Sequence, residues 1–163
     1  MTTTDRKTTV HRIYIYAPMQ QVWDAICDPT INGQYGYHAP SNYELRPGGA
    51  YAVPATPEMQ AHGAPAMLID GEVIACDPPS RLEQTWRAFF SPDTVAEGFT
   101  HLLWELTEEL GGMTRLTVTH DVTDAPNIEG ATTSDTKLHE GGGGWAWILS
   151  DLKTLLETGQ ASQ

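Results

Sequence analysis

The sequence predicts an α+β domain in which one long C-terminal helix covers the apolar face of a curved antiparallel sheet. Two observations carry this prediction. Between Trp145 and Leu156, apolar residues recur at three- and four-residue spacing, and Gly159 follows where a helix C-cap is expected. Most of the preceding chain consists of short segments in which apolar and polar residues alternate, which is typical of strands buried on one face.

The first strand and two short helices are expected near the start of the chain. Residues 10–16 alternate between apolar and polar side chains, which predicts a strand. Apolar residues at helical spacing then predict a helix from Pro18 to about Cys27. Pro29 suits the first turn of a second short helix.

The stretch from Gly33 to Pro65 is the least regular part of the sequence. It is rich in glycine, proline and tyrosine, and short strands are expected near Asn42–Leu45 and Ala50–Pro54. The segment Pro57–Pro65 is predicted to be a loop.

Four further strands complete the predicted sheet. Alternation runs over Ala66–Cys76, and the turn residues Asp77-Pro78-Pro79 lead to a strand at Arg81–Arg87. A second strand pair follows, joined across Gly111-Gly112. The same concave face is expected to collect Leu82, Gln84, Trp86, Leu102, Trp104, Leu106, Leu116, Val118 and His120.

Length and charge restrict the classes of function. The 163 residues suit one domain, expected at 10–159 between flexible ends at 1–9 and 160–163. Nine basic against 21 acidic residues give a net charge of -12, which argues against nucleic acid and anionic membrane surfaces as partners. No apolar run reaches the roughly 18 residues of a membrane span and no secretory signal is visible, so a cytoplasmic protein is expected.

Several chemical motifs are missing from the sequence. Cys27 and Cys76 lack CxxC spacing, which favours two buried reduced thiols over a disulfide. The six histidines form neither HxxxH nor HExxH, so no metal is expected. There is no GxGxxG, Walker loop or GxSxG, and we therefore expect no cofactor. Glu72 and Glu97 are interpreted as solvated carboxylates.

A single helix seldom fills the space over a sheet, so a cavity with apolar walls is expected between them. Gln84 and His120 lie on the inward face, where a buried polar group needs a hydrogen-bond partner. A ligand or water could be that partner, and His120 could instead bond a neighbouring carbonyl. His120 could act as a general acid or base, whereas Gln84 could orient a carbonyl or hydroxyl. The predicted ligand-binding residues are Tyr51, Met67, Gln84, Trp86, Leu102, Trp104, Val118, His120, Trp145 and Leu149.

Four consecutive glycines, Gly141 to Gly144, precede the terminal helix and are poor helix formers. They are expected to form a mobile start of the helix, which is either a plain linker or a gate to the cavity. The predicted gate consists of Gly142 and Gly143 with Tyr35 and Tyr37 across the mouth.

The order of elements and six short segments resemble the START-like (SRPBCC) superfamily, in the branch of the activator of heat-shock-protein-90 ATPase. The resemblance covers about Val10 to Gly159. It implies a helix-grip fold with a cavity between helix and sheet, closed at one end by two small helices. The segments are Ala17-Pro18 before Val22-Trp23-Asp24-Ala25, Asp70-Gly71-Glu72-Val73, Asp77-Pro78-Pro79, Leu82 to Trp86, Thr114 to His120, and Gly144-Trp145.

The resemblance does not imply one activity, because members bind lipids, hormones or polyketides, act as cyclases, hydratases or cochaperones, or protect producers from their own antibiotics. Three hypotheses follow. The first is noncatalytic binding or sequestration of a small apolar molecule, in natural-product metabolism or antibiotic self-resistance. The second is a polyketide cyclase or hydratase that uses His120. The third is a cochaperone-like interaction domain, although the additional N-terminal domain of the eukaryotic cochaperone is not recognised here. The protein is expected to be a monomer or homodimer.

Overall fold

The computed structural model describes residues 5–162, which form both helices and strands. Its strands are β1 (Thr8–Ile15), β2 (Asn42–Tyr43), β3 (Ala50–Pro54), β4 (Met67–Asp77), β5 (Arg81–Ala88), β6 (Thr100–Glu108) and β7 (Thr114–Asp121). Its helices are α1 (Met19–Cys27), α2 (Pro29–Asn32), α3 (Pro57–Ala61), α4 (Pro92–Glu97), α5 (Pro126–Thr132) and α6 (Gly144–Thr158), with short 3₁₀ turns η1 (Leu110–Gly112) and η2 (Leu138–Glu140).

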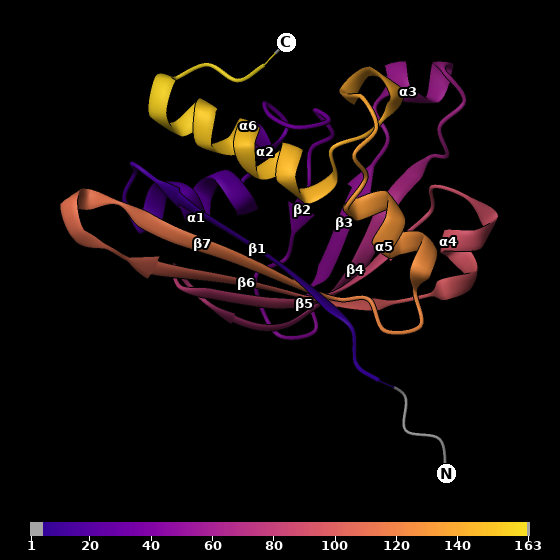
Figure 1. Cartoon of the computed structure of the whole chain (residues 1–163), viewed down its shortest axis with the longest axis horizontal. Helices are drawn as coiled ribbons and strands as arrows, with labels where there is room; N and C mark the ends of the chain where they lie inside the picture. Colours follow the sequence, from indigo (N-terminus) through magenta and orange to yellow (C-terminus); the bar gives the residue numbers. More distant parts are fainter. Residues whose placement is uncertain (1–4, 163) are drawn as a thin grey trace.

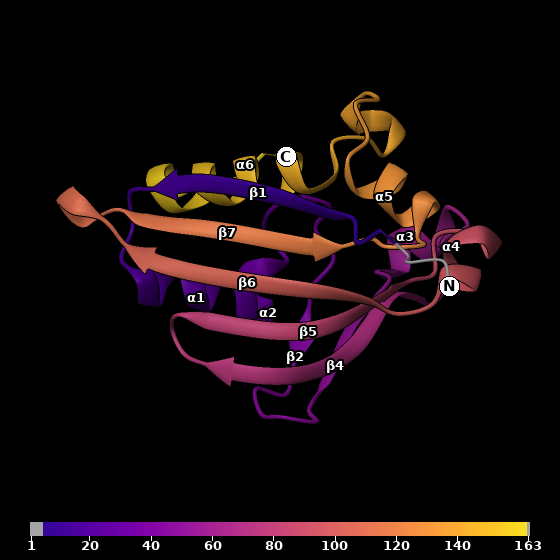
Figure 2. The same ribbon diagram turned by 60° about the horizontal axis from the view of Figure 1, so that its bottom comes forward.

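The seven strands form one antiparallel sheet in the order β1-β7-β6-β5-β4-β3-β2 (Figure 2). The register places Trp104 of β6 opposite both Leu82 and Val118. Leu102 lies opposite Gln84 on one side and His120 on the other. Because side chains of paired residues share one face, this register collects the predicted inward residues on a single surface.

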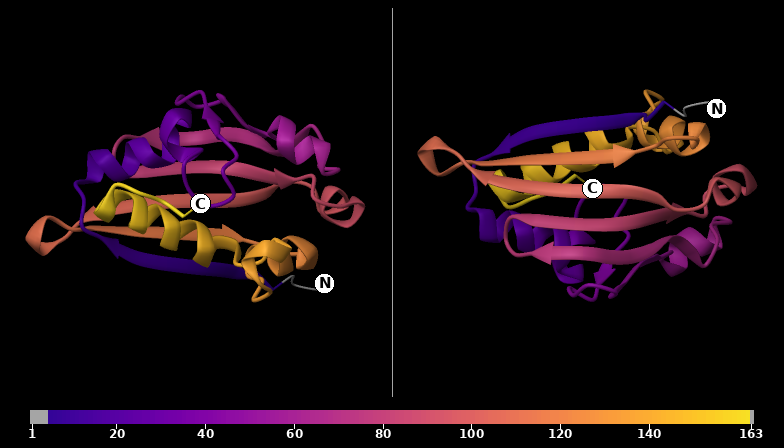
Figure 3. Two further views of the ribbon diagram at one scale, coloured as in Figure 1. Left: turned by 90° about the horizontal axis from the view of Figure 1, so that it is seen from above. Right: turned by 90° about the horizontal axis from the view of Figure 1, so that it is seen from below.

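The helices lie on one side of the curved sheet. α6 crosses the concave face, with α1 and α2 beside it, whereas the strands are in front when the molecule is seen from the opposite side (Figures 1 and 3). The architecture is the α+β helix-grip fold of the START-like proteins, as predicted.

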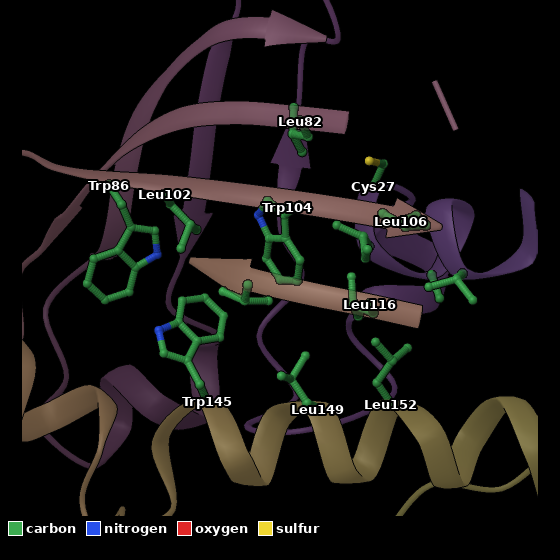
Figure 4. Packing of buried hydrophobic residues seen from close by; sticks show 14 of the residues in the cluster. Cys27, Leu82, Trp86, Leu102, Trp104, Leu106, Leu116, Trp145, Leu149 and Leu152 are labelled. Carbon is green, nitrogen blue, oxygen red and sulfur yellow. The ribbon is translucent and has the colours of Figure 1, made fainter. Parts of the chain in front are cut away.

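The middle of the helix packs tightly against the sheet. Leu149 and Leu152 of α6 are buried and point toward Leu106 and Leu116 of the sheet (Figure 4). Along β5 every second residue is buried, which confirms the alternation expected from the sequence. Burial of such apolar side chains stabilises the fold.

The predicted strands and the first helices are confirmed, with boundaries that differ by a few residues. The prediction of a loop over Pro57–Pro65 is wrong in part, because Pro57–Ala61 forms α3. Thr56 caps this helix by accepting a hydrogen bond from the Met59 amide. Two other short helices, α4 and α5, were not expected from the sequence.

The long helix begins at Gly144 and ends at Thr158, and Gly159 takes the left-handed C-cap conformation with φ 83°. The glycines before it form a hydrogen-bonded turn, in which the Gly142 and Gly143 amides donate to Lys137 and Ser134 carbonyls. A side chain on Gly142 would overlap the carbonyl of Thr136. The backbone therefore approaches more closely here than any residue with a Cβ would allow.

Of the termini predicted to be flexible, residues 1–4 and 163 lie outside the described residues. β1 begins at Thr8, and the Lys7 amide donates to Thr123. At the other end, Ser162 donates from its amide and its hydroxyl to the buried carboxylate of Asp151.

Both cysteines are free, as predicted, but only Cys27 is buried and Cys76 is half-buried. Burial raises the pKa of the Cys27 thiol, so it stays protonated at neutral pH. Within residues 5–162, no helix combines the length and apolar character that crossing a membrane requires.

Candidate functional site

A pocket of about 510 Å³ lies between the first turns of α6, the concave face of the sheet and the segments around residues 35–43 and 130–141. The helix does not cover this end of the sheet, so the hollow remains beside the packed layer. Eight aromatic side chains line it: Tyr35, Tyr37, Tyr43, Tyr51, Trp86, Phe90, Trp104 and Trp145.

Three tryptophans from three elements form the inner wall of the pocket (Figure 4). Trp145 of α6 meets Trp104 of β6 edge to face, with ring centroids 5.5 Å apart. Trp86 of β5 lies 6.2 Å from Trp145 by the same measure. Each indole is at least nine-tenths buried, and such contacts stabilise aromatic pairs beyond their buried area.

Two stacked tyrosines form the adjoining wall. The rings of Tyr43 and Tyr51, from β2 and β3, are 4.6 Å apart and inclined by 24°. Burial raises the pKa of Tyr51 to about 12 and that of Tyr43 well above its usual value. Both phenols are therefore neutral at physiological pH.

Gln84 is fully buried behind the pocket lining and holds one ring of each wall in place. Its Oε1 accepts hydrogen bonds from the Tyr43 hydroxyl at 2.8 Å and from Trp104 Nε1 at 3.1 Å. From the sequence a ligand or water was expected as its partner, whereas here the protein supplies it. Gln84 is thus a positioning residue for the pocket wall.

His120 is also fully buried and connects Trp145 to the sheet. An indole N–H can only donate, so Trp145 Nε1 donates to His120 Nδ1 at 3.1 Å and the ring proton is on Nε2. Nε2 then donates to the Thr100 hydroxyl at 2.8 Å, which in turn donates to the Trp86 carbonyl. Every hydrogen-bonding atom of the imidazole is engaged.

The environment of His120 strongly disfavours its protonation. Burial lowers the pKa of His120 to about 4, and the nearby His11 acts in the same direction, while Asp121 opposes the shift. The imidazole is therefore neutral at physiological pH, and its protonation at Nδ1 would break the bond from Trp145.

The rim of the pocket is tied to α6 through Tyr37 and Asp151. The Tyr37 hydroxyl donates to the Gly142 carbonyl at 2.8 Å and accepts from the Gly144 amide at 3.0 Å. Asp151 accepts from the Gly36 amide at 2.8 Å. Burial favours the neutral form of Asp151, but hydrogen bonds from Ser162 and Gly36 outweigh it and lower the pKa, so the carboxylate stays ionised.

The structure brings together part of the predicted set. Tyr51, Trp86, Trp104 and Trp145 line the pocket, and so do the predicted gate residues Tyr35, which is buried, and Tyr37, which is partly exposed. The remaining predicted residues are not among those lining it. These are Met67, Gln84, Leu102, Val118, His120 and Leu149, with the glycines Gly142 and Gly143 of the predicted gate.

The reason for this division is the position of α6. Leu102 and Val118 of the sheet and Leu149 of α6 are buried where sheet and helix are in direct contact. Gln84 and His120 sit one layer behind the rings that they hold. In the glycine run, Gly141 and Gly144 reach the pocket instead.

Sequence reasoning missed the wall formed by α5 and the segment after it. Gly130, Ala131 and Thr132 line the pocket, and α5 is held by Glu97, which accepts hydrogen bonds from the amides of Asn127 and Ile128. Glu97 is therefore a helix cap rather than merely a solvated carboxylate. Glu72 is exposed, as expected.

Within the described part of the chain, no three His, Cys, Asp or Glu side chains gather in a way that could hold a metal ion. Every buried side-chain nitrogen and oxygen there has a hydrogen-bond partner. The polar atoms of the core are thus satisfied by the protein itself.

Comparisons with known proteins agree with this architecture. CalU16 from Micromonospora echinospora is 23% identical, with a TM-score of 0.64 over 94% of this chain and 78% of its own. DynU16, a protein in the dynemicin biosynthetic locus, is 23% identical with a TM-score of 0.66; the match covers 96% of this chain and 49% of DynU16. PFC0360w, an HSP90 activator from Plasmodium falciparum, is 15% identical with a TM-score of 0.54, over 94% of this chain and 89% of its own.

A search among curated proteins found no match. The family model described as Activator of Hsp90 ATPase homolog 1-like protein matches residues 16–157, which is most of the chain. The chain belongs to this family, in the START-like superfamily.

Proposed function

We propose that the protein binds or sequesters a small, flat, largely apolar molecule in the aromatic pocket, without catalysing a reaction. The observation that carries this proposal is a hollow of about 510 Å³ lined by eight aromatic side chains. This volume falls in the range of roughly 300–1,000 Å³ that is usual for small-molecule sites. Aromatic walls favour planar ligands, because rings stack with offset or edge-to-face geometry.

We propose distinct roles for the predicted site residues. Tyr51, Trp86, Trp104 and Trp145 would contact the ligand. Gln84 and His120 would hold the rings in place, as their hydrogen bonds to Trp104 and Trp145 support. Leu102, Val118 and Leu149 would support the wall from the packed layer, whereas Met67 lies outside both the pocket lining and the core cluster.

The likeness to a protein of the dynemicin biosynthetic locus supports a role in natural-product metabolism or antibiotic self-resistance. The enzymatic alternative is less well supported, because His120 is neutral, fully engaged and behind the pocket wall. A cochaperone-like role stays a hypothesis, as do the cytoplasmic location and the monomeric or dimeric state.

The binding proposal can be tested by filling the pocket from α5. Gly130 lines the pocket, and a Cβ built there meets no atom within 4 Å, so Gly130→Phe can place a ring in the hollow without displacing backbone. We expect this variant to bind 9-anthracenemethanol at least tenfold more weakly than the wild type. Quenching of tryptophan fluorescence measures the affinity, and native mass spectrometry of the purified protein would show any co-purified small molecule.

Thr133→Phe is the matched control, because Thr133 is exposed and does not line the pocket. It should bind the probe as the wild type does. Equal affinity of the Gly130→Phe variant and the control would refute binding in this pocket.

We further propose that Tyr37 and the glycine turn gate the pocket. Alanine at Gly142 would force the backbone apart and so cannot test this idea. Tyr37→Phe keeps the ring and removes the hydrogen bonds to Gly142 and Gly144, at a cost of about 1 kcal/mol in stability. We expect the probe to dissociate several-fold faster in stopped-flow measurements. Unchanged dissociation would rule out a gate at this position.

A further inference from the structure

The aromatic wall of the pocket turns its hydrogen-bond donors toward the protein. Five of the eight lining rings donate their N–H or O–H to protein acceptors at 2.7–3.1 Å: Tyr35, Tyr37, Tyr43, Trp104 and Trp145. These donors are not available to a ligand, because they already donate to backbone carbonyls, Gln84 and His120. The rings therefore present mainly their π faces to the hollow.

The pocket also offers no permanent positive charge. Among the described residues that line it there is neither lysine nor arginine, and the lining holds one histidine, His38, and one carboxylate residue, Glu140. Burial raises the pKa of Tyr35, Tyr37 and Tyr51, so these phenols remain neutral. Glu140 lies at the exposed lip, where its side chain is 58% accessible.

A charged ligand must replace its lost hydration with protein partners. An anion needs N–H or O–H donors or a cation. Within residues 5–162 no lysine or arginine lines the pocket, and of its seven ring donors only those of Tyr51 and Trp86 are left outside these hydrogen bonds. A cation needs electron-rich partners instead, and the negative face of an aromatic ring is one of them. A carboxylate at the lip adds to the same preference.

We infer that the pocket discriminates by charge, accepting neutral and cationic planar aromatic ligands and rejecting anionic ligands of the same shape. The inference rests on the proposed function and specifies its ligand class, namely polycyclic aromatics that carry hydroxyl or amine substituents rather than a carboxylate. The engagement of five ring donors and the lack of lysine and arginine among the described lining residues carry it.

Three probes with one ring system test this inference. 9-Anthracenemethanol is neutral, 9-anthracenemethylamine is a cation at pH 7, and 9-anthracenecarboxylate is an anion. We expect the carboxylate to bind at least tenfold more weakly than the alcohol, and the ammonium to bind at least as tightly as the alcohol. Fluorescence titration at fixed ionic strength measures all three affinities.

A Glu140→Lys variant tests whether the preference arises at the pocket. The ratio of ammonium to carboxylate affinity should fall at least fivefold. Glu108→Lys changes the net charge by the same amount. Glu108 ends β6 at the end of the sheet that is far from α5, so this variant should leave the ratio unchanged (Figure 1). An equal fall in both variants would assign the preference to the overall charge of -12 and overturn the inference.

The failures of the two proposals are distinguishable. If the alcohol binds and the ammonium binds as weakly as the carboxylate, the pocket only excludes charge, and the inference is wrong while the binding function stands. If all three probes bind equally, charge discrimination is likewise refuted. If none of them binds, the proposed function fails and the inference fails with it.

Discussion

Replacing Trp145 by alanine should lower the free energy of unfolding by about 3–5 kcal/mol, the usual cost of removing a large buried aromatic side chain. The indole is 5% exposed, packs edge to face on Trp104 and donates to His120. The variant loses this packing and leaves His120 Nδ1 without a donor. Urea denaturation followed by far-UV circular dichroism measures the loss.

Two further variants separate packing from hydrogen bonding. Trp145→Phe keeps an aromatic ring and removes the N–H, so it should cost about 1–3 kcal/mol, the price of one unsatisfied buried acceptor. Trp147→Ala removes an indole from the same helix, but from a half-buried position, and should cost less than half as much as Trp145→Ala. Equal losses for Trp147→Ala and Trp145→Ala would contradict the central place of Trp145 in the core.

Acidification should destabilise the protein by about 3 kcal/mol through His120 alone between pH 6.5 and 4. The unfolded chain protonates this histidine near pH 6.5, whereas in the folded protein its pKa is about 4. In this window the unfolded state binds more protons, so stability falls as the pH falls and is unaffected by this group above about pH 7. The magnitude follows from roughly 1.4 kcal/mol per pKa unit.

A His120→Gln variant isolates this effect. Glutamine can accept from Trp145 and donate to Thr100, but it does not titrate. Other groups, including His11 and Asp121, titrate in both proteins, so the wild-type minus variant stability should change by about 3 kcal/mol between pH 7 and 4. Parallel stability profiles would contradict the prediction. In the folded wild type, the ring NMR signals of His120 should not titrate above about pH 5, which checks the pKa even if the variant does not fold.

The long helix and the main strands were predictable because their signals are local and repeated. The apolar stripe of α6 and the alternation in β5, β6 and β7 extend over eight or more residues. Each repeat of the pattern therefore supports the same assignment of helix or strand. The helices α3, α4 and α5 are five to seven residues long. At that length caps decide whether a helix forms, and the cap of α5 comes from Glu97, which lies 30 residues from Asn127 in sequence.

The candidate site was predictable in part, namely its sheet face, Trp145 of α6 and the tyrosines Tyr35 and Tyr37. Alternation places Gln84, Trp86, Trp104 and His120 inward, and all four are buried. It does not reveal that Trp104 borders the hollow while Leu102 lies in the packed layer, because both occupy equivalent positions on one strand. The place at which α6 crosses the sheet decides which of the two residues borders the hollow.

The sequence by itself determined which residues are buried, because burial of apolar surface follows the periodicity of each strand and helix. Tertiary structure alone decided which of those residues touch one another and where space remains. Gln84 meets Tyr43 across 41 positions of sequence, and His120 meets Trp145 across 25. Such pairs depend on the angle and placement of whole elements, and no local pattern of side chains encodes them.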